Sequence, residues 1–230
     1  MSNPVYVALD TTDAAKAALL AGRLRGLVGG IKLGLEFYTA NGPAAVSAVS
    51  DVGLPVFLDL KLHDIPNTVA GGMKGMARLK PALTTIHASG GLAMMKAAVE
   101  AAREHAPATK VLAVTILTSI DQQAMNDIGY PGSVLDQVKR LAALAQAAGV
   151  DGLVCSPLEV EAVRALVGPG MTLVVPGIRP AWAEAGDQKR VMTPREALAR
   201  GADVLVIGRP ITGAADPAEA ARRIAEELAA

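Results

Sequence analysis

Short runs of β-branched and aliphatic residues recur along the chain, and almost every gap between two runs carries a helical pattern. The runs predict strands at residues 5–9, 30–34, 55–60, 83–87, 110–117, 150–154, 171–175 and 202–207. Nearly continuous apolar runs, unlike alternating ones, are typical of parallel strands that are covered on both faces. Eight such strands, alternating with helices in 230 residues, predict an α/β fold of the (β/α)8 TIM-barrel type. A doubly wound sheet is the alternative, weakened because no G-x-G-x-x-G follows the first run.

Helix starts between the strands are marked by capping patterns. Residues 156–159 (S-P-L-E) and 193–196 (T-P-R-E) each combine an N-cap, a proline at the first helical position and a capping-box glutamate. Ser133 begins another predicted helix, which Gly149 ends. No Ser/Gly-rich linker or change in composition divides the chain, so we expect a single domain over residues 1–230.

The charge balance and the cysteine count limit the function classes. Lysine and arginine total 22, and aspartate and glutamate also total 22. The chain therefore has no excess of positive charge that would attract nucleic acid or an anionic membrane. The single cysteine, Cys155, cannot form an internal disulfide, which fits a reducing compartment. The first ten residues lack the pattern of a signal peptide, and no apolar run reaches 18 residues. We therefore expect a cytoplasmic protein without nucleic-acid or membrane partners.

In a barrel of this type, function is expected where the strands end and in the loops that follow them. Asp59 and Lys61 are two residues apart on one predicted strand, so they share a face, and in a barrel that face is the interior. Lys32, one strand earlier, can reach the same point. Together with Asp64, these residues predict an alternating array of two ammonium and two carboxylate groups. For each residue alone, a structural ion pair is the alternative, and Asp64 could instead cap the following helix.

A phosphate site is predicted next to the last two strands. The stretch after the seventh strand is long, basic and rich in Gly and Pro, and the eighth strand ends in Ile207-Gly208-Arg209. In this fold the loops after strands 7 and 8 are the usual phosphate site. Arg179, Gly208 and Arg209 are therefore the candidate phosphate-binding residues, the alternative being a solvated loop with a capping glycine.

The chain also resembles a known family through motifs that occur in order over nearly its whole length. They are V-A-L-D at 7–10, K-L-G at 32–34, D-L-K-L-H-D-I-P-N-T at 59–68, L-T-S at 117–119, P-G-I-R-P at 176–180, G-D-Q-K-R at 186–190 and I-G-R-P at 207–210. Together they make the chain similar to the orotidine 5′-phosphate decarboxylase family of the bacterial type. The resemblance implies that orotidine 5′-monophosphate (OMP) is converted into uridine 5′-monophosphate (UMP) and CO2 in pyrimidine synthesis, without metal or cofactor.

The resemblance also implies roles for residues at the reacting carbon. Lys61 would stabilise the C6 carbanion and protonate it, and Asp59 would lie against the substrate carboxylate. Lys32 and Asp64 would hold the array in place, with Lys32 and Asp10 also reaching the ribose hydroxyl groups.

Further roles follow by the same resemblance for the rest of the substrate and for a partner subunit. Thr118 would bind the pyrimidine edge, Gln188 would bridge base and phosphate, and Arg179, Gly208 and Arg209 would bind the phosphate. Pro176 belongs to the same substrate-binding set. A homodimer is implied, in which each subunit contributes Asp64, Ile65 and Thr68 to its neighbour's site.

Two other functions stay open at this point. A Mg²⁺-dependent decarboxylase or aldolase for phosphorylated sugars could use Glu36, Asp59 and Asp64 as oxygen ligands, although Lys32 and Lys61 would repel the metal. The second open function is a catalytically inactive, phosphate-binding barrel. Such a protein would be expected to lack one of the four charges of the array, and none is missing. We interpret His87, at the end of a predicted strand, as a buried and hydrogen-bonded structural residue. We interpret Cys155 as structural too, because it follows an apolar run with no basic cluster nearby.

Overall fold

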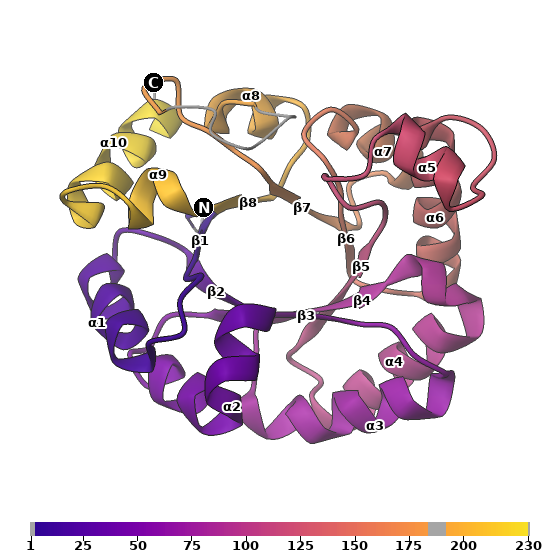
Figure 1. The fold of residues 1–230 in the computed structure, drawn as a ribbon, viewed down its shortest axis with the longest axis horizontal. Coiled ribbons are helices and arrows are strands. Elements are labelled where there is room, and N and C mark those ends of the chain that lie inside the picture. The colour runs from indigo at the N-terminus through magenta and orange to yellow at the C-terminus, as the bar shows by residue number, and fades with distance from the viewer. Residues whose placement is uncertain (1–2, 184–191, 230) are drawn as a thin grey trace.

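The strands close into a barrel in the order of the chain (Figure 1). The computed structural model describes residues 3–183 and 192–229, and within them eight parallel strands pair consecutively, β8 closing on β1. The strands are β1 (Val5–Ala8), β2 (Gly30–Gly34), β3 (Val56–Leu62), β4 (Leu83–His87), β5 (Lys110–Val114), β6 (Gly152–Val154), β7 (Thr172–Pro176) and β8 (Val204–Ile207). The predicted (β/α)8 barrel is confirmed.

Helices surround the barrel on the outside (Figure 1). They are α1 (Ala14–Leu24), α2 (Leu35–Ser50), α3 (Pro66–Met76), α4 (Gly91–His105), α5 (Gln122–Asp127), α6 (Val134–Ala148), α7 (Val160–Val167), α8 (Pro194–Ala199), α9 (Arg209–Thr212) and α10 (Pro217–Ala229), with 3-10 turns η1 (Ala77–Leu79) and η2 (Ala88–Gly90). In the described part of the chain, no helix has the length and apolar character needed to cross a membrane.

Two of the three predicted helix starts are confirmed and one is wrong. Ser133 and Thr193 each close a capping box at the start of α6 and α8. The third pattern forms a turn instead, and α7 begins at Val160. Glu159 still accepts a hydrogen bond from the backbone N–H of Ser156, at 3.0 Å. The Ser156 hydroxyl group accepts from the backbone N–H of Leu158 at 3.2 Å, so these side chains hold the turn that leads directly into α7.

The apolar residues form an inner and an outer layer. The inner cluster fills the barrel interior and includes Phe57, Leu112 and Val174. The outer cluster, which includes Ile31 and Leu58, lies between the strands and the helices. Because side chains alternate along a strand, burial on both faces explains the nearly continuous apolar runs of the sequence.

Polar side chains connect neighbouring strands at the N-terminal end of the barrel. Asp151 accepts a hydrogen bond from the backbone N–H of Val111 at 2.8 Å, and Asp203 accepts one from Leu173 at 2.7 Å. Arg164 of α7 pairs with Asp203 at 2.5 Å and donates to the backbone carbonyls of Gly168, Met171 and Gly201. These bonds satisfy backbone groups at the start of the strands, so this end of the barrel serves stability.

We predict that Arg164→Leu lowers the free energy of unfolding by about 2 kcal/mol, because several partly buried acceptors lose their donor together. The control is Arg103→Leu, which removes one exposed, long hydrogen bond to Gly149 and should change stability by less than about 0.5 kcal/mol. Urea unfolding followed by circular dichroism measures both. Equal losses in the two variants would contradict the role given to Arg164.

Candidate functional site

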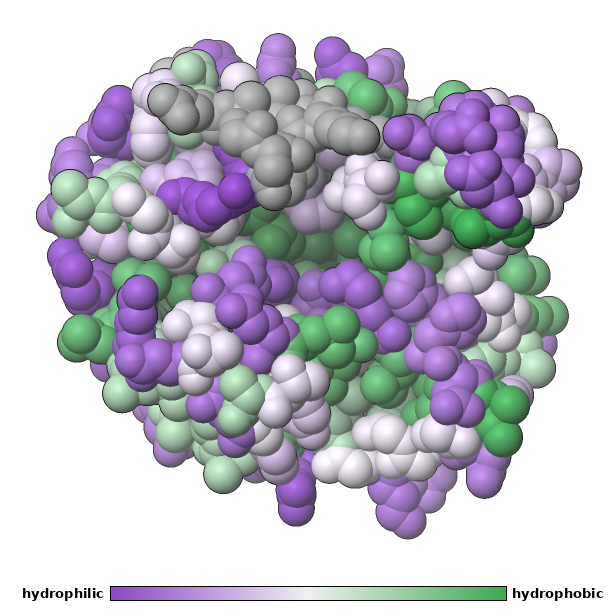
Figure 2. Space-filling view, viewed as in Figure 1, coloured by the Kyte–Doolittle hydropathy of each residue, from purple (hydrophilic) through white to green (hydrophobic). Residues whose placement is uncertain are grey.

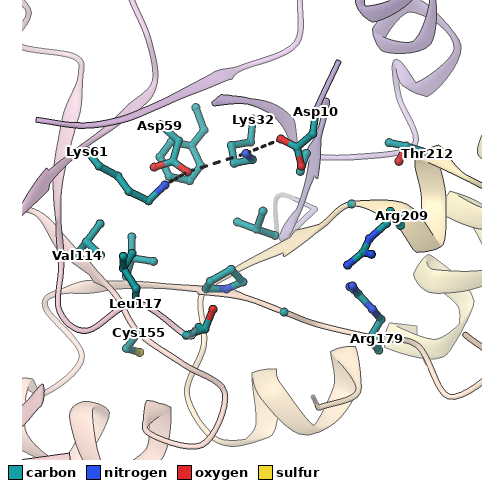
Figure 3. Close-up of a pocket in the computed structure, with 18 of the residues that line it drawn as sticks. Asp10, Lys32, Asp59, Lys61, Val114, Leu117, Cys155, Arg179, Arg209 and Thr212 are labelled. Carbon is teal, nitrogen blue, oxygen red and sulfur yellow. Dashed lines mark hydrogen bonds and ion pairs between the residues drawn. The ribbon is translucent and has the colours of Figure 1, made fainter. Parts of the chain in front are cut away.

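A cavity of about 550 Å³ opens at the C-terminal ends of the strands. Figure 2 shows it as a hollow near the centre of this face, and Figure 3 shows the side chains that surround it. It lies where the fold class places function. The predicted site residues that line it are Asp10, Lys32, Asp59, Lys61, Thr118, Pro176, Arg179, Gly208 and Arg209.

Four charged side chains form a continuous chain of alternating sign along one wall of the cavity (Figure 3). Lys32 Nζ lies 2.9 Å from Asp10 Oδ1 and 4.0 Å from Asp59 Oδ2, and Lys61 Nζ lies 2.8 Å from the same Asp59 oxygen. The side chains of Lys32 and Asp59 are only 12% and 11% exposed. Each charge faces an opposite one, which offsets the cost of removing it from water.

The barrel strands place these charges side by side. Asp59 pairs in register with Gly34 of the neighbouring strand β2, on which Lys32 lies two residues earlier. A Cβ atom added at Gly34 would lie 2.9 Å from Lys32 Nζ, closer than real Cβ contacts allow. A side chain at Gly34 would therefore displace the end of the flexible Lys32 side chain.

Lys61 reaches the cavity through an irregularity of β3. Its φ angle is +52°, a left-handed conformation that is uncommon outside glycine. The register with β4 shifts here: Leu58 pairs with Thr84, but Leu62 pairs with Ile86. The sequence predicted that Asp59 and Lys61 face the interior together, and both do line the cavity. The regular strand that was expected between them is replaced by a bulge.

Two arginines approach one another on the other side of the cavity (Figure 3). Arg179 follows β7 and is buried, with its Nη1 donating to the backbone carbonyl of Ile178 at 3.0 Å. Arg209 begins α9 directly after Gly208 and is exposed. The guanidinium groups thus lie across the cavity from the lysines. Gln188, predicted to contact base and phosphate, lies outside the described residues.

The wall between the two charged regions is largely apolar. It includes Val114, Ile116, Leu117 and Val154, with Thr118 at its half-buried edge. Cys155 also lines the cavity, and burial raises the pKa of its thiol, which keeps it neutral. An uncharged thiol is a poor nucleophile, so the structural interpretation of Cys155 agrees with its environment.

The described structure separates Asp64 from the other members of the predicted array. Asp64, Ile65 and Thr68 are exposed at the beginning of α3 and lie outside the lining of the cavity. The carboxylate of Asp64 accepts from the N–H of Ile65 at 2.6 Å, but the N-cap position belongs to Ile65. The alternative of Asp64 as the helix N-cap is therefore wrong. Within one subunit, Asp10 occupies the fourth place in the array.

The three residues considered as magnesium ligands, Glu36, Asp59 and Asp64, do not lie together, since only Asp59 lines the cavity. Glu36 is exposed on the first turn of α2, away from the cavity lining that contains Asp59. Residues 3–183 and 192–229 contain no group of three His, Cys, Asp or Glu side chains placed to hold a metal ion. His87, half-buried, lies 5.3 Å from His63 between ring centres. Burial and, to a smaller degree, the charges of His63 and Lys61 lower the pKa of His87.

The sequence profile of the Orotidine 5′-phosphate decarboxylase / HUMPS family matches residues 3–224. The chain belongs to this family. It is 67% identical over 99% of both chains to the orotidine 5′-phosphate decarboxylase of Paramagnetospirillum magneticum. It is 57% identical to that of Rhodospirillum rubrum, over 98% of this chain and 94% of the relative. The family resemblance that the motifs indicated is confirmed.

A solved family structure has the same fold. The orotidine 5′-phosphate decarboxylase of Lactobacillus acidophilus superposes with a TM-score of 0.88 at 38% identity, and the match covers 100% of both chains. An uncharacterised conserved protein from Geobacillus kaustophilus is similar as well, with a TM-score of 0.84 at 37% identity. That match covers 98% of this chain and all of the other.

Two residues near the array, Thr85 and Thr212, were not predicted from the sequence. Thr85 of β4 is fully buried, and its hydroxyl group contacts both Asp59 and Lys61. Thr212, at the end of α9, lines the cavity near Arg209 (Figure 3). The alternation of side chains along β4 predicts that Thr85 faces the barrel interior. No pattern in the sequence indicates the bulge of β3 that Thr85 faces.

Proposed function

We propose that this protein is an orotidine 5′-phosphate decarboxylase, which converts OMP into UMP and CO2 in pyrimidine synthesis. The observation that carries the proposal is the Asp10–Lys32–Asp59–Lys61 chain beside one cavity whose other side carries arginines. OMP has an anionic carboxylate at one end and a phosphate at the other, so it matches this distribution of charge. Relatives that carry this activity in their names align with the chain over nearly its whole length.

The chemistry requires electrostatic stabilisation at one carbon. When the bond from C6 to the carboxylate breaks, its electron pair stays on C6 in the plane of the ring and cannot delocalise into the π system. We assign Lys61 as the ammonium group that stabilises this charge and then transfers a proton from Nζ to C6, giving UMP. Lys61 regains a proton from water. The mechanism needs no metal and no cofactor.

Asp59 acts on the substrate carboxylate in this proposal. Its ionised side chain, held by Lys61 at 2.8 Å, lies where a carboxylate on C6 would approach Lys61. The repulsion between the two carboxylates disappears as CO2 leaves, which favours the transition state over bound substrate. Lys32, with Asp10, holds Asp59 in place and binds the ribose hydroxyl groups.

The remaining contacts bind parts of the substrate that do not react. Arg179, Gly208 and Arg209 bind the phosphate, and their guanidinium groups supply paired donors for its oxygens. Thr118 and Pro176 contact the pyrimidine side of the cavity, and Gln188 is assigned to base and phosphate. Binding energy from the distant phosphate helps to orient C6 at Lys61.

We further propose a cytoplasmic homodimer in which Asp64, Ile65 and Thr68 enter the neighbouring subunit's site. The three residues are exposed within the same motif, residues 59–68, that carries Asp59 and Lys61, and Ile65 is 67% exposed. An exposed isoleucine beside a carboxylate suits a contact with a second subunit. In the dimer, Asp64 would become the carboxylate next to the neighbour's Lys61.

Lys61→Ala is predicted to lower kcat for OMP by at least about 100-fold, because the variant lacks both the C6 cation and the proton donor. It should still bind UMP, measured by calorimetry. Lys74→Ala, at an exposed position of α3, is the control and should keep the parent rate. If Lys61→Ala kept more than about a tenth of the rate, a loss below ~1.4 kcal/mol, the assignment of the proton donor would be wrong.

Arg209→Ala is predicted to raise KM for OMP by about 10- to 100-fold, since a charge-assisted contact to phosphate is lost. Steady-state kinetics measure the effect. Arg222→Ala is the control, because Arg222 forms an exposed ion pair with Glu219 on α10, and its KM should not change. An unchanged KM in Arg209→Ala would remove Arg209 from the phosphate site.

Mixing subunits tests the shared site. Lys61→Ala and Asp64→Asn should each be nearly inactive alone, yet a refolded equal mixture should recover about a quarter of the parent activity. Half of the dimers are then mixed, and one of the two sites in each mixed dimer holds both native residues. A mixture as inactive as its parents would place Asp64 in its own subunit's site or outside the site.

A further inference from the structure

The bulge in β3 leaves one residue of β4 opposite three residues of β3. Between the pairs Leu58–Thr84 and Leu62–Ile86, the stretch 59–61 faces Thr85 alone. Ladder bonds cannot serve all three residues of a bulge, and an unpaired buried N–H is costly. A side chain therefore has to supply a hydrogen-bond partner for the backbone at this point.

The Thr85 hydroxyl group is that partner, and the direction of its bonds is determined by chemistry. The backbone N–H of Lys61 can only donate, so the hydroxyl oxygen of Thr85 accepts from it, at 2.9 Å. The hydroxyl proton is then available for Asp59 Oδ1, 2.8 Å away. Thr85 is 0% exposed, so water does not compete for either bond.

The two oxygens of Asp59 are thus held from different sides. Oδ1 accepts from the Thr85 hydroxyl group, and Oδ2 accepts from the Lys61 ammonium group at 2.8 Å. The same hydroxyl group also binds the backbone of Lys61, whose φ angle of +52° needs support from its surroundings. One hydroxyl group consequently links the carboxylate and the backbone from which the ammonium group extends.

We propose that Thr85 is a positioning residue for decarboxylation, whose hydroxyl group sets the Asp59 carboxylate and the Lys61 backbone relative to each other. This inference rests on the proposed function of Asp59 and Lys61. Thr85 lies outside the cavity lining and acts through those two residues. Because it serves the geometry at C6 and not the phosphate contacts, its loss should lower kcat while the affinity for UMP stays the same.

Thr85→Val tests the proposal, since valine has nearly the same shape and lacks the hydroxyl group. Its kcat should fall by about 10- to 100-fold, with the dissociation constant of UMP unchanged. Thr85→Ser restores the hydroxyl group and should return kcat to within about threefold of the parent. All rates are measured well below the melting temperature of each variant.

Thr84→Val is the matched control. Thr84 is the preceding residue of β4, is also 0% exposed, and donates its hydroxyl proton to the backbone carbonyl of Leu58 at 3.0 Å. Removal of the Thr84 hydroxyl group should lower the thermal stability about as much as Thr85→Val does, but it should leave kcat unchanged. A loss of kcat that is confined to Thr85→Val and reversed in Thr85→Ser supports the proposal.

Several outcomes would overturn it. They are a parent-like kcat in Thr85→Val, equal kcat losses in Thr85→Val and Thr84→Val, and an equal loss in Thr85→Ser. If Thr85→Val does not fold, Thr85→Cys replaces it, and a parent-like kcat in that variant counts against the proposal. If neither folds while Thr84→Val does, the hydroxyl group is structural and positioning is rejected. An active Lys61→Ala would instead reject the proposed function itself.

Discussion

The Asp59 carboxylate between two ammonium groups is the interaction on which the candidate site depends. Asp59 is mostly withdrawn from water, and an isolated buried carboxylate is costly. Lys61 at 2.8 Å and Lys32 at 4.0 Å offset this cost, and Asp10 in turn neutralises Lys32. The charges are thereby fixed before a ligand arrives, so little reorganisation is needed when charge develops at C6.

The barrel makes this arrangement possible by bringing strand ends together. Lys32 and Asp59 come from adjacent parallel strands, and both project into an interior that apolar side chains fill below them. This interior cluster packs beneath the charges, and the cavity lies above it at the C-terminal ends of the strands. At the N-terminal end, Arg164 and Asp203 use similar charges for a different purpose, to join neighbouring segments. Position along the barrel axis therefore separates the functional charges from the stabilising ones.

The sequence was sufficient for the architecture and for most of the cavity. Strands β2 and β4 match the predicted residues 30–34 and 83–87, because buried parallel strands need apolar residues on both faces. Asp59 and Lys61 could be placed in the interior by counting along the strand. The bulge could not be predicted, since it depends on the register between β3 and β4, and so the role of Thr85 stayed hidden. Asp64 is exposed just before α3 in the single chain, so an array that includes it requires the second subunit that the resemblance implies.

Carbanion stabilisation by Lys61 can be measured directly as hydrogen exchange at C6 of UMP, which requires neither the carboxylate nor its loss. If Lys61 and its neighbours stabilise the C6 carbanion, the protein should exchange the C6 hydrogen of bound UMP for deuterium in D2O, seen as loss of its proton NMR signal. We expect exchange well above the rate in buffer, and far slower exchange with Lys61→Ala. Exchange at the buffer rate, or equal exchange in both proteins, would contradict it.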